Sequence, residues 1–192
     1  MRKVVVRGVG AVTPLGADLA SSWSALLRGE MALRCVGDGT SGLVGPSESS
    51  ALSEPLHEYP VGRALLEEAV AREGLSAKEL RRLDPVAQLA LCASREAMRE
   101  AQLGDAVGAS GDPATHADGL DPVRFGVVMG VGYGSTTTHL QTMDKLQAGK
   151  PDRLSPFTIP ASMPNAAASQ LAMAFGARGP ALTVGTACAS GS

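Results

Sequence analysis

The sequence is poor in aromatic residues and in cysteine, and it has no long apolar run. Aromatic side chains make up 3% of the 192 residues, so a core has to be built from Ala, Val, Leu and Met. The apolar run Val4–Val6 is too short for a signal peptide, and no segment approaches the ~18 apolar residues of a membrane span. The three cysteines, Cys35, Cys92 and Cys188, lack the spacing of metal ligands. These absences favour a protein of the reducing cytoplasm.

The sequence also lacks a large excess of charge of either sign. The 17 Lys and Arg residues and the 19 Asp and Glu residues leave a net charge of −2, which argues against a nucleic-acid-binding surface. A hydrophobic content of 44% is typical of a globular protein, and 192 residues suit one domain or slightly more. Composition therefore leaves the question of function to the motifs.

Apolar β-branched runs alternate with helical patterns along the chain. Lys3–Val9, Phe125–Met129 and Ala181–Val184 are each predicted to be buried strands. Because the strands are apolar throughout and helices separate them, the pattern predicts an α/β fold. We expect a mostly parallel sheet with helices on both faces.

The helices are predicted from spacing and from signals at their ends. The clearest start is Asp84–Pro85, an N-cap followed by proline at the first helical position. Weakly periodic segments separate the helices. We expect a loop with short strands at 36–60, an exposed loop at 104–123, and an extended or irregular segment at 151–160. We expect helices over Ser22–Leu27 (capped by Asp18 or Ser21 and stopped by Gly29), Val61–Glu73 (stopped by Gly74), Pro85–Leu103 (stopped by Gly104), Thr136–Leu146 and Ala166–Phe175 (stopped by Gly176).

The most informative segment follows the last predicted strand, where Cys188 has only small neighbours. The pattern places this thiol where a strand gives way to a helix, and free N–H groups and the helix dipole at that point favour the thiolate. Small neighbours let a bulky substrate approach the sulfur. The pattern therefore predicts a nucleophilic cysteine, and the alternative is a buried thiol that packs as a small hydrophobe.

This segment resembles the active-site signature of the β-ketoacyl-acyl-carrier-protein synthases, the condensing enzymes of fatty-acid and polyketide synthesis. The signature has a glycine, four residues, an aliphatic residue, two residues, a small residue, the cysteine and three small residues. Every constrained position is met, by Gly179, Val184, Ala187, Cys188, Ala189, Ser190 and Gly191. A pattern of this length is far more specific than a lone cysteine.

Further stretches look like the elongating synthases of this family rather than its initiating synthases or the degradative thiolases. They occur in the family's order and at compatible spacings. These stretches are Lys3–Val6 with Gly8, Gly10 and Thr13–Gly16, Arg81–Asp84 leading into a helix, Gly126–Gly134, Ser155–Phe157, and Arg178–Pro180.

The resemblance implies a thiolase-like fold, of which this chain holds part of the first half. Residues 1–192 are expected to be the N-terminal domain of a β-ketoacyl synthase, truncated just after the active-site cysteine. The implied reaction is a decarboxylative Claisen condensation, in which an acyl group on Cys188 reacts with malonyl-carrier protein. Cys188 is the implied nucleophile, and its backbone N–H is an implied oxyanion donor. The family's catalytic histidines and lysine lie in its second half, and His57, His116 and His139 match no catalytic motif.

The resemblance also implies a substrate site and partners. Tyr133 falls where the family often has a smaller residue lining the acyl tunnel, so it predicts a preference for short acyl chains or an unusual primer; the alternative is a tyrosine used in packing or a dimer contact. Lys78, Arg81 and Arg82 are expected to bind the acidic acyl carrier protein, unless they form an ordinary solvated helix face. A homodimer, or a heterodimer with a related synthase subunit, is implied. No metal is implied, and no cofactor beyond the carrier's phosphopantetheine.

Two other functions stay open from the sequence. The chain is also compatible with a non-catalytic fragment or partner subunit of a condensing enzyme. A remote alternative is a dinucleotide-binding domain, since Gly8 and Gly10 follow a predicted strand, but Thr13 replaces the third glycine of that motif. We also expect an uncovered sheet face, and therefore expect residues 1–192 alone to aggregate or to need a partner chain.

Overall fold

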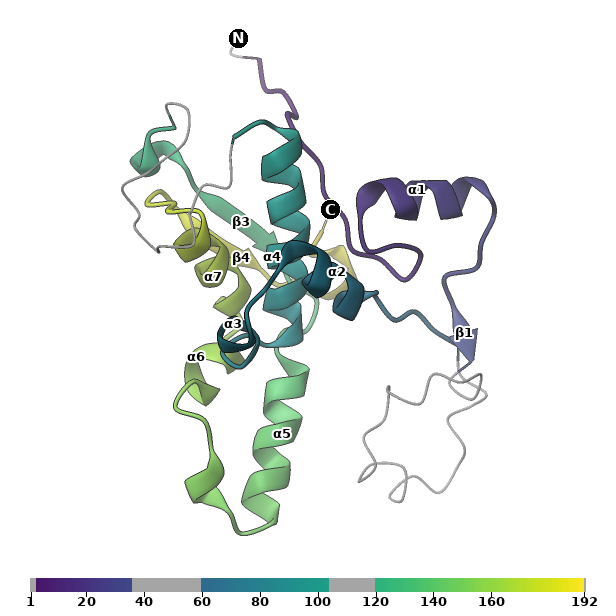
Figure 1. The fold of residues 1–192 in the computed structure, drawn as a ribbon. Helices are drawn as coiled ribbons and strands as arrows, with labels where there is room; N and C mark the ends of the chain where they lie inside the picture. Colours follow the sequence, from purple (N-terminus) through teal and green to yellow (C-terminus); the bar gives the residue numbers. More distant parts are fainter. Residues whose placement is uncertain (1–2, 36–59, 104–119, 192) are drawn as a thin grey trace. The chain divides into compact units, whose positions relative to one another are not determined.

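The computed structural model describes residues 3–35, 60–103 and 120–191 (Figure 1). Residues 36–59 of one predicted loop and 104–119 of the other lie outside these ranges, as does the expected helix stop Gly104. The chain divides into two compact units, one of residues 11–65 and one of residues 1–10 with 66–192. None of the helices within the described ranges is long and apolar enough to cross a membrane.

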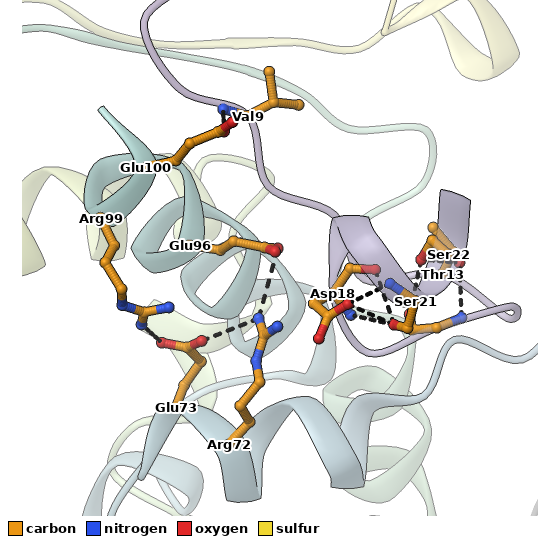
Figure 2. Close-up of polar contacts among 11 residues, drawn as sticks. Val9, Thr13, Asp18, Ser21, Ser22, Arg72, Glu73, Glu96, Arg99 and Glu100 are labelled. Carbon is orange, nitrogen blue, oxygen red and sulfur yellow. Dashed lines mark hydrogen bonds and ion pairs between the residues drawn. The ribbon is translucent and has the colours of Figure 1, made fainter. Parts of the chain in front are cut away.

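The unit of residues 11–65 contains helix α1 (Leu19–Leu27) and two short antiparallel strands, β1 (Arg34–Cys35) and β2 (Pro60–Val61). The Asp18 carboxylate caps α1, because Oδ1 accepts the Ser21 N–H over 2.6 Å (Figure 2). The Ser21 side chain contacts the Asp18 backbone in return, which completes a capping box. The helix therefore begins three residues before the predicted Ser22.

The other unit is organised around helix α4 (Pro85–Glu100), which packs against α2 (Leu66–Glu73) and α7 (Ala166–Ala174). Its predicted start is confirmed, with Asp84 as the N-cap and Pro85 in the first turn. The helix ends at Glu100 rather than at Leu103. Its buried side chains are Ala87, Ala90, Leu91 and Cys92.

Two strands form a parallel pair, β3 (Val127–Gly130) and β4 (Ala181–Val184). Helix α7 packs against both strands, and the parallel pairing predicted from the sequence is confirmed. The strands are less buried than predicted. The side chains of Val128 and Leu182, which pair in register, are 72% and 55% exposed, because nothing among the described residues covers that face.

The predicted strand over Lys3–Val9 is wrong. This segment pairs with no strand within the described ranges, and Val4 is 95% exposed. The segment runs instead along the C-terminal part of α4, where a Cβ on Gly8 or Gly10 would come closer than 3.0 Å to a helix carbonyl. Arg7 Nη2 also donates to the Ala101 carbonyl over 3.0 Å. An apolar β-branched run becomes a strand only when another strand supplies hydrogen-bond partners.

Several smaller elements differ from the predictions. Helix α2 begins at Leu66 and not at Val61, which belongs to β2. A capping box between Ser76 and Glu79 starts the short helix α3 (Ala77–Leu80), which sequence analysis missed. Segment 151–160, predicted as irregular, contains the 3-10 helix η4 (Pro151–Arg153) and the start of helix α6 (Thr158–Ser162). Helix α5 (Thr136–Gln147) agrees with its prediction to one residue. The 3-10 helices η3 (Pro122–Arg124) and η5 (Ala187–Ala189) complete the order.

A buried carboxylate holds α2 against α4. The Glu73 side chain is 1% exposed, and its Oε2 accepts a hydrogen bond from Arg99 Nη2 over 2.6 Å (Figure 2). Its Oε1 lies 3.0 Å from Arg72 Nη2 in an ion pair. Arg95 Nη1 donates to the Glu73 carbonyl oxygen over 3.0 Å. The buried charge is thus compensated by arginines of both helices.

Candidate active site

Cys188 lies in η5, which begins three residues after the end of the parallel strand β4, and it is exposed. The predicted position after a strand is confirmed. The described residues end at Gly191, and within them the thiol lies in the middle of a three-residue 3-10 turn. Because a helix dipole builds up over several turns, it cannot be used here as a reason for a stabilised thiolate.

The turn that carries Cys188 is held by Ser190. Ser190 Oγ accepts the Thr186 N–H over 2.9 Å and lies 2.6 Å from the Ala187 carbonyl oxygen, to which it can donate. It also lies 3.2 Å from the carbonyl oxygen of Val131, at the end of β3. Ala187 has φ 51°, in the left-handed region that is unfavourable for residues other than glycine. Ser190 therefore holds the turn that carries Cys188, a contact that its small size alone did not predict.

An open hollow of about 470 Å³ lies beside the cysteine turn. Tyr133 lines it, but as an exposed side chain (87%), so the described residues form a hollow with a tyrosine at its edge and no enclosed tunnel. Cys188 itself is outside the lining. The lining residues are Val131, Gly132, Tyr133, Pro164, Asn165, Thr183, Gly185 and Ala187.

The three expected carrier-binding residues lie on α3 and on the turn that follows it. Arg81 and Arg82 line a cleft of about 340 Å³ that also involves α5 and α6. The Arg82 guanidinium carbon lies 4.8 Å from the centre of the Phe157 ring, which is cation–π geometry. Lys78 is exposed on α3 and does not line the cleft. The structure therefore brings together two of the three predicted residues.

A third cation in this cleft, Lys145 of α5, was missed by sequence analysis. A signal for it existed. Thr138, Gln141 and Thr142 precede Lys145 at helical spacing, so the four residues form one polar face of the predicted helix over 136–146.

Asp84 connects the cleft to the start of α5. It is 4% exposed, and its Oδ2 accepts both the N–H and the hydroxyl of Thr138, over 2.8 and 2.7 Å. Its Oδ1 accepts the Val86 N–H over 3.1 Å. One carboxylate thus orders the first turns of α4 and α5, whereas the sequence predicted only the cap on α4.

The side chains of Cys92 and Cys188 have very different surroundings. Cys92 is fully buried in α4, and this burial, together with the nearby Glu73 carboxylate, raises the pKa of its thiol to about 11. Cys188 is exposed. Of the histidines, His139 is exposed on α5, and His57 and His116 lie outside the described residues. Accessibility therefore selects Cys188 over Cys92 as the candidate nucleophile.

Comparisons with curated proteins agree with the resemblance seen in the motifs. The chain is 31% identical over 194 residues to the 3-oxoacyl-[acyl-carrier-protein] synthase 2 of Staphylococcus aureus (strain COL), covering 99% of this chain and 40% of that protein. It is 30% identical over 190 residues to Nodulation protein E of Rhizobium sp. (strain N33), covering 98% of this chain and 40% of that protein. The chain thus spans about two fifths of the length of these relatives.

Solved structures share the fold. A crystal structure of a β-ketoacyl synthase from Burkholderia phymatum STM815 superposes with a TM-score of 0.63 at 23% identity, covering 100% of this chain and 41% of that one. The AntDE:AntF complex, a type II PKS acyl-carrier protein with its ketosynthase bound to the hexaketide, gives a TM-score of 0.59 at 18% identity, over 93% of this chain and 40% of that one. These likenesses confirm the expected thiolase-like α/β fold.

The family itself is shown by a match along the whole sequence. The sequence model described as "Beta-ketoacyl synthase, N-terminal domain" matches residues 1–192, which include the signature around Cys188. The chain therefore belongs to the β-ketoacyl synthase family.

Proposed function

We propose that this chain is the N-terminal domain, ending just after the active-site cysteine, of a 3-oxoacyl-[acyl-carrier-protein] synthase of fatty-acid or polyketide biosynthesis. The observation that carries the proposal is the complete cysteine signature, with Cys188 exposed on the turn after β4. The 31% identity to a 3-oxoacyl-[acyl-carrier-protein] synthase 2 over nearly the whole chain supports it.

In the proposed first half-reaction, Cys188 becomes acylated. Its thiolate attacks the thioester carbonyl carbon of the acyl-carrier protein, and the electron pair of the C=O bond moves to oxygen. The Cys188 N–H donates a hydrogen bond to this oxyanion. Collapse of the intermediate breaks the C–S bond of the thioester, and the carrier leaves as a phosphopantetheine thiolate that takes up a proton.

In the second half-reaction, malonyl-carrier protein loses CO₂, and the resulting carbanion attacks the carbonyl carbon of the acyl-cysteine. Breaking of that C–S bond releases the Cys188 thiolate and a β-ketoacyl carrier protein. We assign no residue of this chain to the decarboxylation. Full condensation is therefore proposed for the protein that carries this domain, and residues 1–192 alone are expected to be inactive.

Tyr133 is proposed to favour short acyl chains or an unusual primer. Its ring borders the hollow beside the cysteine turn, and replacing an aliphatic side chain by a phenol reduces the space available to an acyl group. Tyr133→Ile in the full-length protein is expected to raise kcat/KM for long acyl chains about tenfold relative to short ones. Equal use of long and short chains by the unchanged protein would contradict this assignment.

The proposed partners are an acyl carrier protein and a second synthase subunit, identical or related. Lys78, Arg81 and Arg82 are proposed to attract the acidic carrier. The complex of an acyl-carrier protein with its ketosynthase in a structural relative supports a carrier as the partner. A cytoplasmic location is also proposed, because the three cysteines lack the pattern of an oxidised framework.

The test is acylation of the full-length protein by an acyl-carrier protein, followed by peptide mass spectrometry. We expect the acyl mass on the peptide that contains Cys188, and no acyl mass after Cys188→Ala. Cys92→Ala serves as the control and should leave acylation unchanged, because Cys92 is buried in α4. Absence of acyl-Cys188 in the unchanged protein would favour the alternative of a non-catalytic partner subunit.

A further inference from the structure

The cleft beside Arg81 and Arg82 has the features of a binding site for a small acidic group. It lies between the turn before α4, the first turns of α5, and α6 with the residues before it, and it encloses about 340 Å³. The turn before α4 thus meets a second region of the chain, formed by α5 and α6, more than 40 residues later in the sequence. Its lining is Leu80–Pro85, Gln88, Thr137, Thr138, Gln141, Thr142, Lys145, Ser155, Phe157, Thr158 and Ala161.

The side chains that line this cleft give it a positive charge, which acidic residues of the lining do not neutralise. Arg81, Arg82 and Lys145 line it, and none of them forms an ion pair with another of the described residues. Asp84 is the one carboxylate in the lining, and both of its oxygens accept hydrogen bonds from Thr138 and Val86. An anionic group entering the cleft would therefore meet three cations.

The cleft is also partly ordered before any ligand enters. Phe157 holds the guanidinium of Arg82 over its ring at 4.8 Å, which limits the rotamers that Arg82 can adopt. Thr137, Gln141 and Thr158 contribute further groups that can donate hydrogen bonds to carboxylate oxygens. Order of this kind reduces the entropy lost on binding.

Helix α5 connects this cleft to the hollow beside the cysteine turn. The helix begins at Thr136, one residue after the segment Gly132–Gly134, of which Gly132 and Tyr133 line the hollow. Lys145 lies nine positions after Thr136, which corresponds to about 14 Å along a helix axis. A protein bound at the cleft would thus be close to the place where its acyl group is needed.

We infer that this cleft receives an acidic side chain of the carrier protein, and that Lys145 joins Arg81 and Arg82 as a docking residue. The inference rests on the proposed function and extends its carrier-binding set from the turn before α4 to α5. The inference does not include Lys78, because that side chain does not line the cleft.

The test is Lys145→Glu in the full-length protein, with two acyl donors. One donor is an acyl-carrier protein, and the other is the same acyl group on N-acetylcysteamine, a small thioester without a carrier. We expect the KM for the carrier-bound donor to rise about tenfold with kcat unchanged, because reversing a charge at a docking contact changes affinity. Transfer from the small thioester should be unaffected. Lys145→Arg keeps the positive charge and should have the KM of the unchanged protein. The difference in KM between Lys145→Glu and the unchanged protein should shrink at high salt.

Lys3→Glu is the matched control, because it reverses the same charge at an exposed position that does not line the cleft. An unchanged KM in Lys145→Glu, with a raised KM in Arg81→Glu, would overturn the inference and leave the carrier-binding proposal standing. Unchanged KM values in both variants would overturn both. Equal loss of transfer from the small thioester would show that Lys145 is structural, which also overturns the inference. The Lys145→Glu variant can also be assayed with carriers in which one acidic residue is changed to lysine. A carrier that brings the KM back to its original value would identify the residue that enters the cleft.

Discussion

Cys92 and Cys188 place the same functional group in opposite surroundings. Cys92 is fully buried in α4, beside a helix pair joined by Glu73, and its thiol has a pKa of about 11. Cys188 is exposed on a three-residue turn at the end of β4. The thiolate is the reactive form, so burial makes Cys92 inert while Cys188 stays accessible. The environment and not the residue type thus separates the structural thiol from the candidate nucleophile.

The same contrast holds for the two regions that carry these cysteines. Around α4 and α2, the buried charge of Glu73 is matched by Arg72 and Arg99. On β3 and β4, the paired side chains of Val128 and Leu182 stay exposed. The helical region is therefore completed by contacts within the chain, whereas one side of the strand pair remains open within the described residues.

The reactivity of the two thiols should show the largest difference. At pH 8 a thiol of pKa about 11 is ~10⁻³ ionised, so we expect iodoacetamide to modify Cys188 at least ~100-fold faster than Cys92. Peptide mass spectrometry after timed labelling measures both rates. Labelling in denaturing urea is the control, because unfolding removes the burial of Cys92 and should bring the two rates together. Equal rates in the native protein would show that burial does not protect the Cys92 thiol.

Removing the buried carboxylate of Glu73 should give the next largest effect, a loss of folding stability. Glu73→Ala leaves Arg72 and Arg99 without this partner and is expected to lower the free energy of unfolding by ~2 kcal/mol, less than for a fully buried pair because both arginines are partly exposed. Urea denaturation measures the change. Glu68→Ala, at an exposed position of the same helix, should cost only a few tenths of a kcal/mol. Similar losses in both variants would argue against a role for Glu73 in joining α2 to α4.

The open strand face should affect solubility more than stability. Residues 1–192 expressed alone are expected to aggregate, since apolar side chains on the strand pair are exposed. Replacing Val128 and Leu182 together by threonine keeps the β-propensity and should raise the soluble fraction about twofold or more. Centrifugation and gel densitometry measure that fraction. A sharp thermal transition from a soluble, unmodified monomer would contradict the expectation.

The smallest effect is expected from Glu79. The hydrogen bond from the Ser76 side chain, with Arg95 as a further contributor, lowers its pKa below the ordinary value of 4.5. Its contribution to stability is therefore present above pH 4.5 and is lost as the pH falls through the lower folded value. Because the side chain is 40% exposed, the loss should stay below ~1 kcal/mol. Glu79→Gln should flatten the pH dependence of the urea midpoint in this window, and an unchanged slope would contradict the assignment.

Predictions based on a local signal agreed well with the structure. The Asp84–Pro85 start of α4 and the helix ends near Gly29 and Gly176 were recognised because caps and turns act within a few neighbouring residues. Predictions that needed a distant partner were weaker. Lys3–Val9 has the composition of a strand but finds no strand to pair with among the described residues. Lys145 was not predicted because Arg81 and Arg82, which line the same cleft, come from another part of the chain.

The sequence by itself determined the family and the candidate nucleophile, since the signature around Cys188 is a run of local constraints on residue size. It also determined the start of α4. Tertiary structure alone decided that Cys92 is buried, that Asp84 also orders α5, and that Lys145 lines one cleft with two arginines. The physical reason is that burial, charge pairing and cleft formation depend on residues that meet only when distant segments pack together.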